Sequence, residues 1–208
     1  KISKNILLLD EFPEKKAFKL IGKKNVEFKN YPIPSWNLLK NKFNFKIALK
    51  NSSFLIIQTS RGCPYSCTFC TAPFYYGNLY QQKSVESVID EIKYIKNLGI
   101  TEILFYSEIF TFNKKWVKNL CSEIINQDLN IKWMCNSRVD TVDEELLHLM
   151  KKAGCWLISY GIESASQITL NLSKKKYDKN QAKKTIAITN KSGILSIGHF
   201  ILGMPNET

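Results

Sequence analysis

The chain has 208 residues, of which 44% are hydrophobic and 12% aromatic. This length and composition can bury a core, and they exclude an intrinsically disordered protein. Lys and Arg number 30 against 18 Asp and Glu, a formal charge of +12 that suits nucleic acid or an anionic membrane surface. Because the lysines are scattered along helical faces, we interpret them instead as solvated surface. We find no secretory leader and no apolar run near the roughly 20 residues of a membrane span.

Residues 1–53 differ from the rest of the chain. They are rich in lysine, hold three of the six prolines and show no repeat of the pattern that follows. A proline-rich stretch at 31–39 contains Trp36 as an aromatic anchor, which is typical of a semi-rigid strap between domains. We therefore predict an N-terminal linker over 1–53 and a separate domain over 54–208.

From residue 54 onward, short apolar runs of strand length alternate with amphipathic helical patterns. The predicted strands are 54–59, 102–107, 131–136, 156–160 and 195–202. Capping signals flank the four helices, namely Gly99 after the first, Asn113 before the second, Thr141 with Glu144 before the third and Gly154 after it, and Asp178 with Gln181 before the fourth and Gly193 after it. This alternation predicts an α/β fold with a parallel sheet built from right-handed crossovers.

Cys63, Cys67 and Cys70 form a Cys-x3-Cys-x2-Cys run directly after the first predicted strand. Each iron of a four-iron, four-sulfur (4Fe-4S) cluster normally takes one cysteine, so three thiolates leave one iron open. An open metal position can bind a substrate or cofactor directly. A zinc knot is the alternative, but zinc usually takes four ligands from spaced cysteine pairs, and no second pair follows. His148 and His199 lie far off in sequence.

The chain has six cysteines, and the other three are isolated. This pattern does not make a disulfide framework, which favours the reducing cytoplasm. We interpret Cys121, Cys135 and Cys155 as small buried hydrophobic side chains.

The cysteine spacing, with the aromatic Phe69 just before the third cysteine, resembles the signature of the radical S-adenosylmethionine (SAM) enzymes. Residues 155–167 resemble the fourth-strand motif of that family, and residues 200–208 resemble its fifth. The stretch 31–39 resembles the connector that precedes the radical barrel in the branch with an N-terminal cobalamin-binding domain. The cobalamin ligand loop of that domain, Asp-x-His-x-x-Gly, is missing from residues 1–53.

The resemblance implies a 4Fe-4S cluster whose open iron is chelated by SAM and whose reduction cleaves SAM to a 5'-deoxyadenosyl radical. It also implies a cobalamin-dependent methyl transfer, rearrangement or cyclisation, a small-molecule or lipid-like substrate, and a reductant such as flavodoxin or ferredoxin. The family usually has a six-stranded partial barrel. We therefore expect this chain to be a fragment that stops one βα unit short, with an exposed apolar edge beside its fifth strand.

Polar residues follow the predicted strands at the end where the functional loops of a parallel α/β barrel gather. The resemblance gives Glu163 contact with the adenosyl ribose or the methionyl amino group. Ser107 stands where many relatives have an acid, and the following Glu108 is an alternative for that role. Phe69 completes the expected cofactor-binding set beside the cluster.

A basic residue soon after the fourth strand often meets the methionyl carboxylate in related enzymes, which suggests Lys174 or Lys175. Arg138 is an alternative, because a guanidinium offers bidentate donors to a carboxylate. Each residue also has a structural explanation. Glu163 would cap a turn, Arg138 would pair with Asp140, and the lysines would form a solvated face.

Two other functions remain open from the sequence. One is a sulfur-inserting or RNA-modifying radical SAM relative that holds RNA through its positive charge. The other is a non-catalytic iron-sulfur or zinc-binding fragment.

Overall fold

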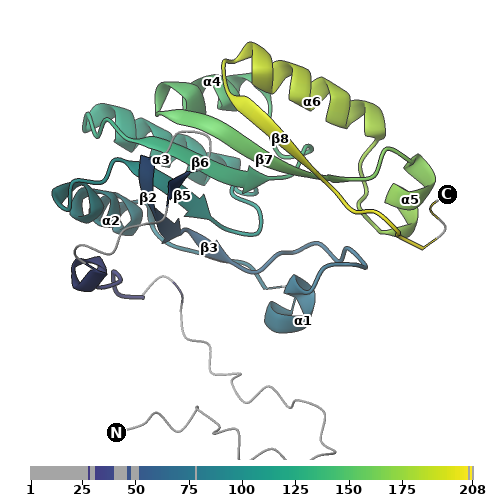
Figure 1. Cartoon of the computed structure of the whole chain (residues 1–208), viewed down its shortest axis with the longest axis horizontal. Helices are drawn as coiled ribbons and strands as arrows, with labels where there is room; N and C mark the ends of the chain where they lie inside the picture. The colour runs from purple at the N-terminus through teal and green to yellow at the C-terminus, as the bar shows by residue number, and fades with distance from the viewer. Residues whose placement is uncertain are drawn as a thin grey trace, which may run out of the picture.

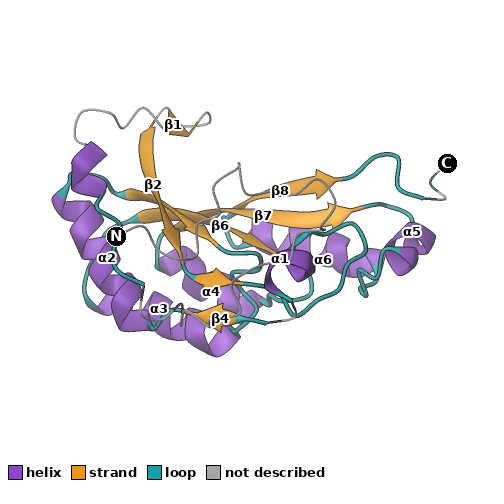
Figure 2. Ribbon diagram, turned by 90° about the horizontal axis from the view of Figure 1, so that it is seen from below, coloured by secondary structure: helices purple, strands orange, loops and turns teal. Residues whose placement is uncertain are grey.

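The computed structural model describes residues 28, 31–39, 46–47, 52–77, 79–205 and 207. Most of the predicted linker over 1–53 lies outside the described residues, as do Asn206 and Thr208 of the loop after the last strand. The described part is built around one sheet with helices packed on one of its faces (Figures 1 and 2).

The main sheet has six strands in the order β1-β2-β5-β6-β7-β8. Their bounds are β1 Lys46–Ile47, β2 Ser52–Gln58, β5 Glu102–Tyr106, β6 Lys132–Ser137, β7 Cys155–Glu163 and β8 Leu195–Phe200. The five strands from β2 to β8 pair in parallel, whereas β1 pairs antiparallel with β2. The five predicted parallel strands are thus confirmed, and the two-residue β1 was not predicted.

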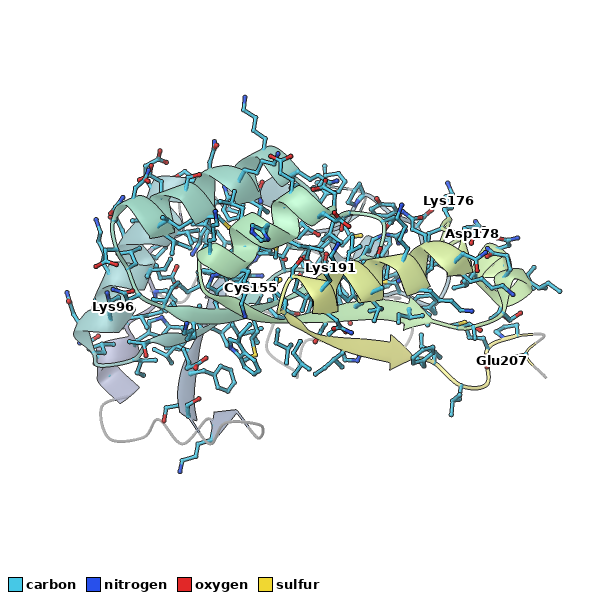
Figure 3. The ribbon with its side chains drawn as sticks, turned by 90° about the horizontal axis from the view of Figure 1, so that it is seen from above. Lys96, Cys155, Lys176, Asp178, Lys191 and Glu207 are labelled. Carbon is cyan, nitrogen blue, oxygen red and sulfur yellow. The ribbon has the colours of Figure 1, made fainter. Side chains whose placement is uncertain are left out.

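Four long helices connect the parallel strands and cover one face of the sheet (Figures 2 and 3). They are α2 Val85–Asn97, α3 Lys114–Asn126, α4 Glu144–Lys152 and α6 Lys179–Lys191. Alternation along the strands feeds the core between helices and sheet. In β2, for example, Leu55 and Ile57 are buried, while Ile56 between them is 42% exposed on the other face.

Short elements, which sequence patterns do not register, complete the fold. They are the 3-10 turn η3 Trp36–Leu39, the antiparallel pair β3 Ser60–Arg61 and β4 Gln81–Gln82, and the helices α1 Ala72–Tyr76 and α5 Gln167–Leu172. None of the helices in the described part of the chain is long and apolar enough to cross a membrane.

The helix caps agree with the sequence in all cases but one. Asn113 accepts a hydrogen bond from the backbone N–H of Trp116 at 3.1 Å, as predicted for the start of α3. The predicted capping box of Thr141 with Glu144 is wrong, because Asp143 caps α4 by accepting from the backbone N–H of Leu146 at 2.9 Å. The hydroxyl of Thr141 is buried and donates to the carbonyl of Arg138 at 2.9 Å instead.

The two edges of the sheet differ. The edge at β2 is paired with β1, whereas β8 is the outermost strand at the other side. Leu195, Ile197 and Phe200 of β8 are 49%, 37% and 57% exposed. The exposed apolar edge expected beside the fifth parallel strand is therefore confirmed.

Candidate functional site

A cavity of about 270 Å³ lies at the carboxyl ends of the parallel strands. It is lined by eight of the nine predicted site residues, namely Cys63, Cys67, Cys70, Phe69, Glu108, Arg138, Glu163 and Lys175. The ninth, Ser107, does not line it. The cysteines follow β2, Glu108 follows β5, Arg138 follows β6, and Glu163 ends β7. The parallel order of the sheet therefore brings these residues to one edge.

The cysteine loop places its three thiols at different depths. Cys63 is buried, Cys67 is half-buried and Cys70 is exposed. A glycine is required before the first cysteine, because Gly62 has φ +86° and a Cβ there would lie 1.9 Å from the carbonyl oxygen of Leu79. Burial raises the pKa of the Cys63 thiol.

The donor set of this loop fits a cluster. No three or more His, Cys, Asp or Glu side chains among the described residues are arranged to hold one metal ion. A single zinc ion needs all of its sulfur ligands at about 2.3 Å, whereas a 4Fe-4S cluster gives each thiolate an iron of its own. Three separated thiols on one loop at the rim of a cavity match the second requirement.

Glu163 and Lys175 form a buried ion pair, with 2.8 Å between Oε1 and Nζ. Their side chains are only 11% and 6% exposed. Room for the pair exists because residue 161 is glycine, since a Cβ there would lie 2.4 Å from Oε1 of Glu163 and 3.0 Å from Nζ of Lys175. Glu163 has φ +68°, a left-handed conformation that is uncommon for a residue with a side chain.

The structural explanations for these two residues do not hold. The cap of α5 is Ser166, which accepts from the backbone N–H of Thr169, so Glu163 is not needed there. Lys175 lies inside the cavity wall, with Nζ 5.7 Å from the centre of the Phe69 ring. Its neighbour Lys174, the other candidate, is exposed, as is Lys176 in the turn before α6 (Figure 3).

The two polar candidates after β5, Ser107 and Glu108, behave differently from Glu163. Oε2 of Glu108 is buried and has no hydrogen-bond partner among the described residues, and burial raises the pKa of this carboxyl group. The hydroxyl of Ser107 is also buried and has no hydrogen-bond partner in the described part of the chain, but Ser107 does not line the cavity. Glu108 is therefore the residue of the two that presents an unused acceptor to a ligand.

Arg138 contacts four different parts of the site. Nε and Nη2 each donate to Asp140 at 2.8 Å, which confirms the expected ion pair, and Nη2 also donates to the carbonyl of Lys175 at 2.7 Å. Nη1 lies 3.8 Å from Sγ of Cys67, and the guanidinium carbon lies 3.8 Å from the centre of the Tyr65 ring. Burial alone would lower the pKa of Arg138, but Asp140 outweighs it and the pKa is raised.

Seven further residues line the cavity that were not among the predicted site residues. They are Tyr65, Ile109, Asn136, Ser137, Ser159, Gly161 and His199. Asn136 pairs with Ser159 across β6 and β7, and Gly161 pairs with His199 across β7 and β8. Polar residues on the face of the sheet away from the helices were the available signal. The sequence offered no such signal for Tyr65, because its place in the site depends on its contact with Arg138.

The remaining cysteines and histidine lie elsewhere. Cys121, Cys135 and Cys155 are at most 1% exposed in the apolar core, as predicted. Burial raises the pKa of Cys121 and of Cys155. His148 is exposed on α4.

Comparison with known proteins gives consistent matches. The model of the Radical SAM superfamily matches residues 57–208. An uncharacterized methyltransferase of Pyrococcus horikoshii is 36% identical over 178 residues, covering 85% of this chain and 38% of the relative. The anaerobic magnesium-protoporphyrin IX monomethyl ester cyclase of Rubrivivax gelatinosus is 32% identical over 178 residues, covering 84% and 32%. The chain therefore spans about a third of the length of these relatives.

Among solved structures, the apo form of the cobalamin-dependent S-adenosylmethionine radical enzyme OxsB is similar with a TM-score of 0.73 and 25% identity. The match covers 85% of this chain and 27% of that one. The parallel sheet with its helices is thus a known arrangement.

Proposed function

The chain belongs to the Radical SAM superfamily, and from this premise we propose that it binds a 4Fe-4S cluster on Cys63, Cys67 and Cys70 and cleaves SAM reductively. When bound, such a cluster supplies the electron that splits the sulfonium into methionine and a 5'-deoxyadenosyl radical. The observation that carries the proposal is the meeting of these three thiols with Glu108, Glu163 and Lys175 in one cavity.

The charged residues of the cavity suit the zwitterionic end of SAM. We assign the ammonium group to Glu108, because its buried Oε2 has no partner among the residues that the structure describes and a carboxylate there can accept a hydrogen bond. We assign the carboxylate to Lys175 and the ribose hydroxyls to Glu163, which neutralise each other at 2.8 Å in this structure. Phe69 supplies an apolar wall beside Lys175.

Arg138 is a poor choice for the SAM carboxylate. Its donors are directed to Asp140, to the carbonyl of Lys175 and toward the sulfur of Cys67. A ligand that recruited the guanidinium would have to break these contacts.

The wider reaction is proposed from the relatives. A methyltransferase and a cyclase stand among them, and the similar solved structure is a cobalamin-dependent enzyme. We propose that residues 1–53 link this core to a cobalamin-binding domain and that the whole protein methylates, rearranges or cyclises a small molecule. A low-potential reductant such as flavodoxin or ferredoxin would feed the cluster, in the reducing cytoplasm that the six unpaired cysteines suit.

A sulfur-inserting relative is less well supported. That chemistry would be favoured by a second cysteine trio, and the other three cysteines of this chain are buried in the core.

The test is anaerobic reconstitution with iron and sulfide, followed by metal analysis and by measurement of 5'-deoxyadenosine after addition of dithionite and SAM. We expect about four irons per chain and release of 5'-deoxyadenosine. Replacing Cys63, Cys67 or Cys70 with Ala should abolish both, whereas Cys121→Ala should abolish neither. A chain that retains zinc but no iron or sulfide would contradict the proposal.

A further inference from the structure

We propose that Arg138 is a positioning residue that donates a hydrogen bond to the sulfur of Cys67 and thereby raises the reduction potential of the cluster. The proposal rests on the proposed function, because it concerns the cluster on the same three cysteines. It assigns Arg138 to the protein side of the site rather than to SAM.

The guanidinium is held by groups on several elements. Asp140 binds one edge of it through two hydrogen bonds of 2.8 Å, and the carbonyl of Lys175 accepts another at 2.7 Å. Tyr65 lies against its flat face at 3.8 Å. Only Nη1 remains directed into the site, and it lies 3.8 Å from Sγ of Cys67, within reach of a hydrogen bond to sulfur.

A cluster of buried hydroxyl groups also fixes the backbone of Arg138. The hydroxyl of Thr141 donates to the carbonyl oxygen of Arg138 at 2.9 Å and lies 2.6 Å from the hydroxyl of Thr111. The hydroxyl of Ser137 is hydrogen-bonded to that of Thr111. All three of these residues are at most 7% exposed. The buried hydroxyl cluster therefore leaves the main chain of Arg138 little freedom, and the guanidinium keeps its place without help from a ligand.

The contact is specific to one cysteine. Among the described residues, only Cys67 of the three ligand cysteines has a hydrogen bond to a charged side chain. Arg138 itself is only 4% exposed, so water screens its charge weakly. Hydrogen bonds to cluster sulfurs and local net charge are among the factors that set the potential of an iron-sulfur cluster.

The direction of the change in reduction potential follows from the charge of the guanidinium. Reduction of a bound cluster would add one electron from a low-potential donor, and no bond to the protein would form or break. The reduced cluster is the more negative of the two states, so a buried cationic donor at a ligand sulfur stabilises it more. Removing the donor should make reduction harder.

The experiment is a redox titration of the reconstituted full chain without SAM, followed by the EPR signal of the reduced cluster. For Arg138→Met we expect the equilibrium constant for reduction to fall at least tenfold, which is 59 mV for a one-electron couple. Arg138→Lys keeps the positive charge but lacks the branched guanidinium, so its reduction potential should lie between those of Arg138→Met and the wild type. Lys118→Met, which removes a positive charge and a surface ion pair with Glu145 on the helical side, is the control and should match wild type.

Each outcome bears on the proposal. An Arg138→Met chain with full iron content and the wild-type potential would overturn it. If that variant holds no cluster, the decision falls to Arg138→Lys, which keeps a positive charge but loses the held guanidinium. A potential more negative than that of the wild type in Arg138→Lys supports the proposal and an unchanged one rejects it. A wild-type chain that retains no cluster refutes the proposed function itself.

Discussion

One face of the sheet is covered by helices, and apolar side chains such as Ile103 and Trp133 are buried in the core there. At the carboxyl edge of the same strands, by contrast, the buried side chains include the charged groups of Arg138, Glu163 and Lys175. Apolar burial stabilises a fold directly. A buried ion pair contributes little, because the desolvation of both charges offsets their attraction. This difference agrees with the proposed function, in which the carboxyl edge binds a ligand while the helix-covered face stabilises the fold.

The largest effect on stability should come from the helix-covered face. Trp133 is fully buried, its ring centre lies 5.1 Å from that of Phe105, and Nε1 donates to the carbonyl of Ala153 at 2.8 Å. Trp133→Ala should lower the free energy of unfolding by about 3–5 kcal/mol, measured by urea denaturation. Trp133→Phe keeps an aromatic ring and should lose clearly less. Equal losses in the two variants would mean that ring packing is not what stabilises this face.

At the carboxyl edge, breaking the ion pair between Glu163 and Lys175 should lower the free energy of unfolding by a similar amount. A second substitution should restore most of that loss. Lys175→Met leaves the carboxylate of Glu163 buried without its cation, at a cost of about 3–5 kcal/mol in unfolding free energy of the cluster-free chain. Adding Glu163→Gln removes the stranded charge and should restore most of the loss. If the double variant lost as much unfolding free energy as the two single variants together, the contrast between the carboxyl edge and the helix-covered face would not hold.

Glu163→Ala separates ligand binding from stability. We expect the cluster to remain and the affinity for SAM to fall by about 1.5–3 kcal/mol, the contribution of a hydrogen bond to a charged group. Equilibrium binding of SAM to the reconstituted variant measures this. Glu145→Ala, which removes one member of the surface pair with Lys118, is the matched control. Unchanged SAM affinity together with a lowered melting temperature would reject the ligand role of Glu163.

The smallest effect should come from a helix cap remote from the cavity. Asp143→Ala should destabilise the chain by about 1 kcal/mol through loss of the α4 cap. Burial by itself would raise the pKa of Asp143, but hydrogen bonds from Lys114 and from the N–H of Leu146 outweigh it and lower the pKa. The stabilising effect is therefore present above the usual aspartate pKa of about 3.9 and lost as the pH falls further. Melting curves of both chains at pH 7 and pH 3 should converge at the lower pH.

The sequence predicted what depends on local periodicity. Buried parallel strands are nearly continuous apolar runs, so all five were found within three residues of their observed ends. The convergence of the strand ends followed from that order, and eight of the nine predicted site residues line one cavity.

What the sequence did not predict depends on partners distant in the chain. Arg138 and Cys67 are 71 positions apart, and no pattern links them. Thr141 looked like a cap because the sequence does not show that its hydroxyl meets Thr111 and the carbonyl of Arg138 in the interior. Ser107 and Glu108 are adjacent and both polar, and only the packing distinguishes the one that reaches the cavity.

The unequal depth of the three thiols has a consequence for damage by air. Cys70 is exposed while Cys63 is buried, so dissolved oxygen or peroxide meets the Cys70 corner of the loop first. Thiolate oxidation proceeds through sulfenic acid to the irreversible sulfinic form. The lifetime of the proposed cluster outside an anaerobic chamber would then be governed by Cys70, its most accessible proposed ligand, and peptide mass spectra of aged samples should carry the first added oxygens on Cys70.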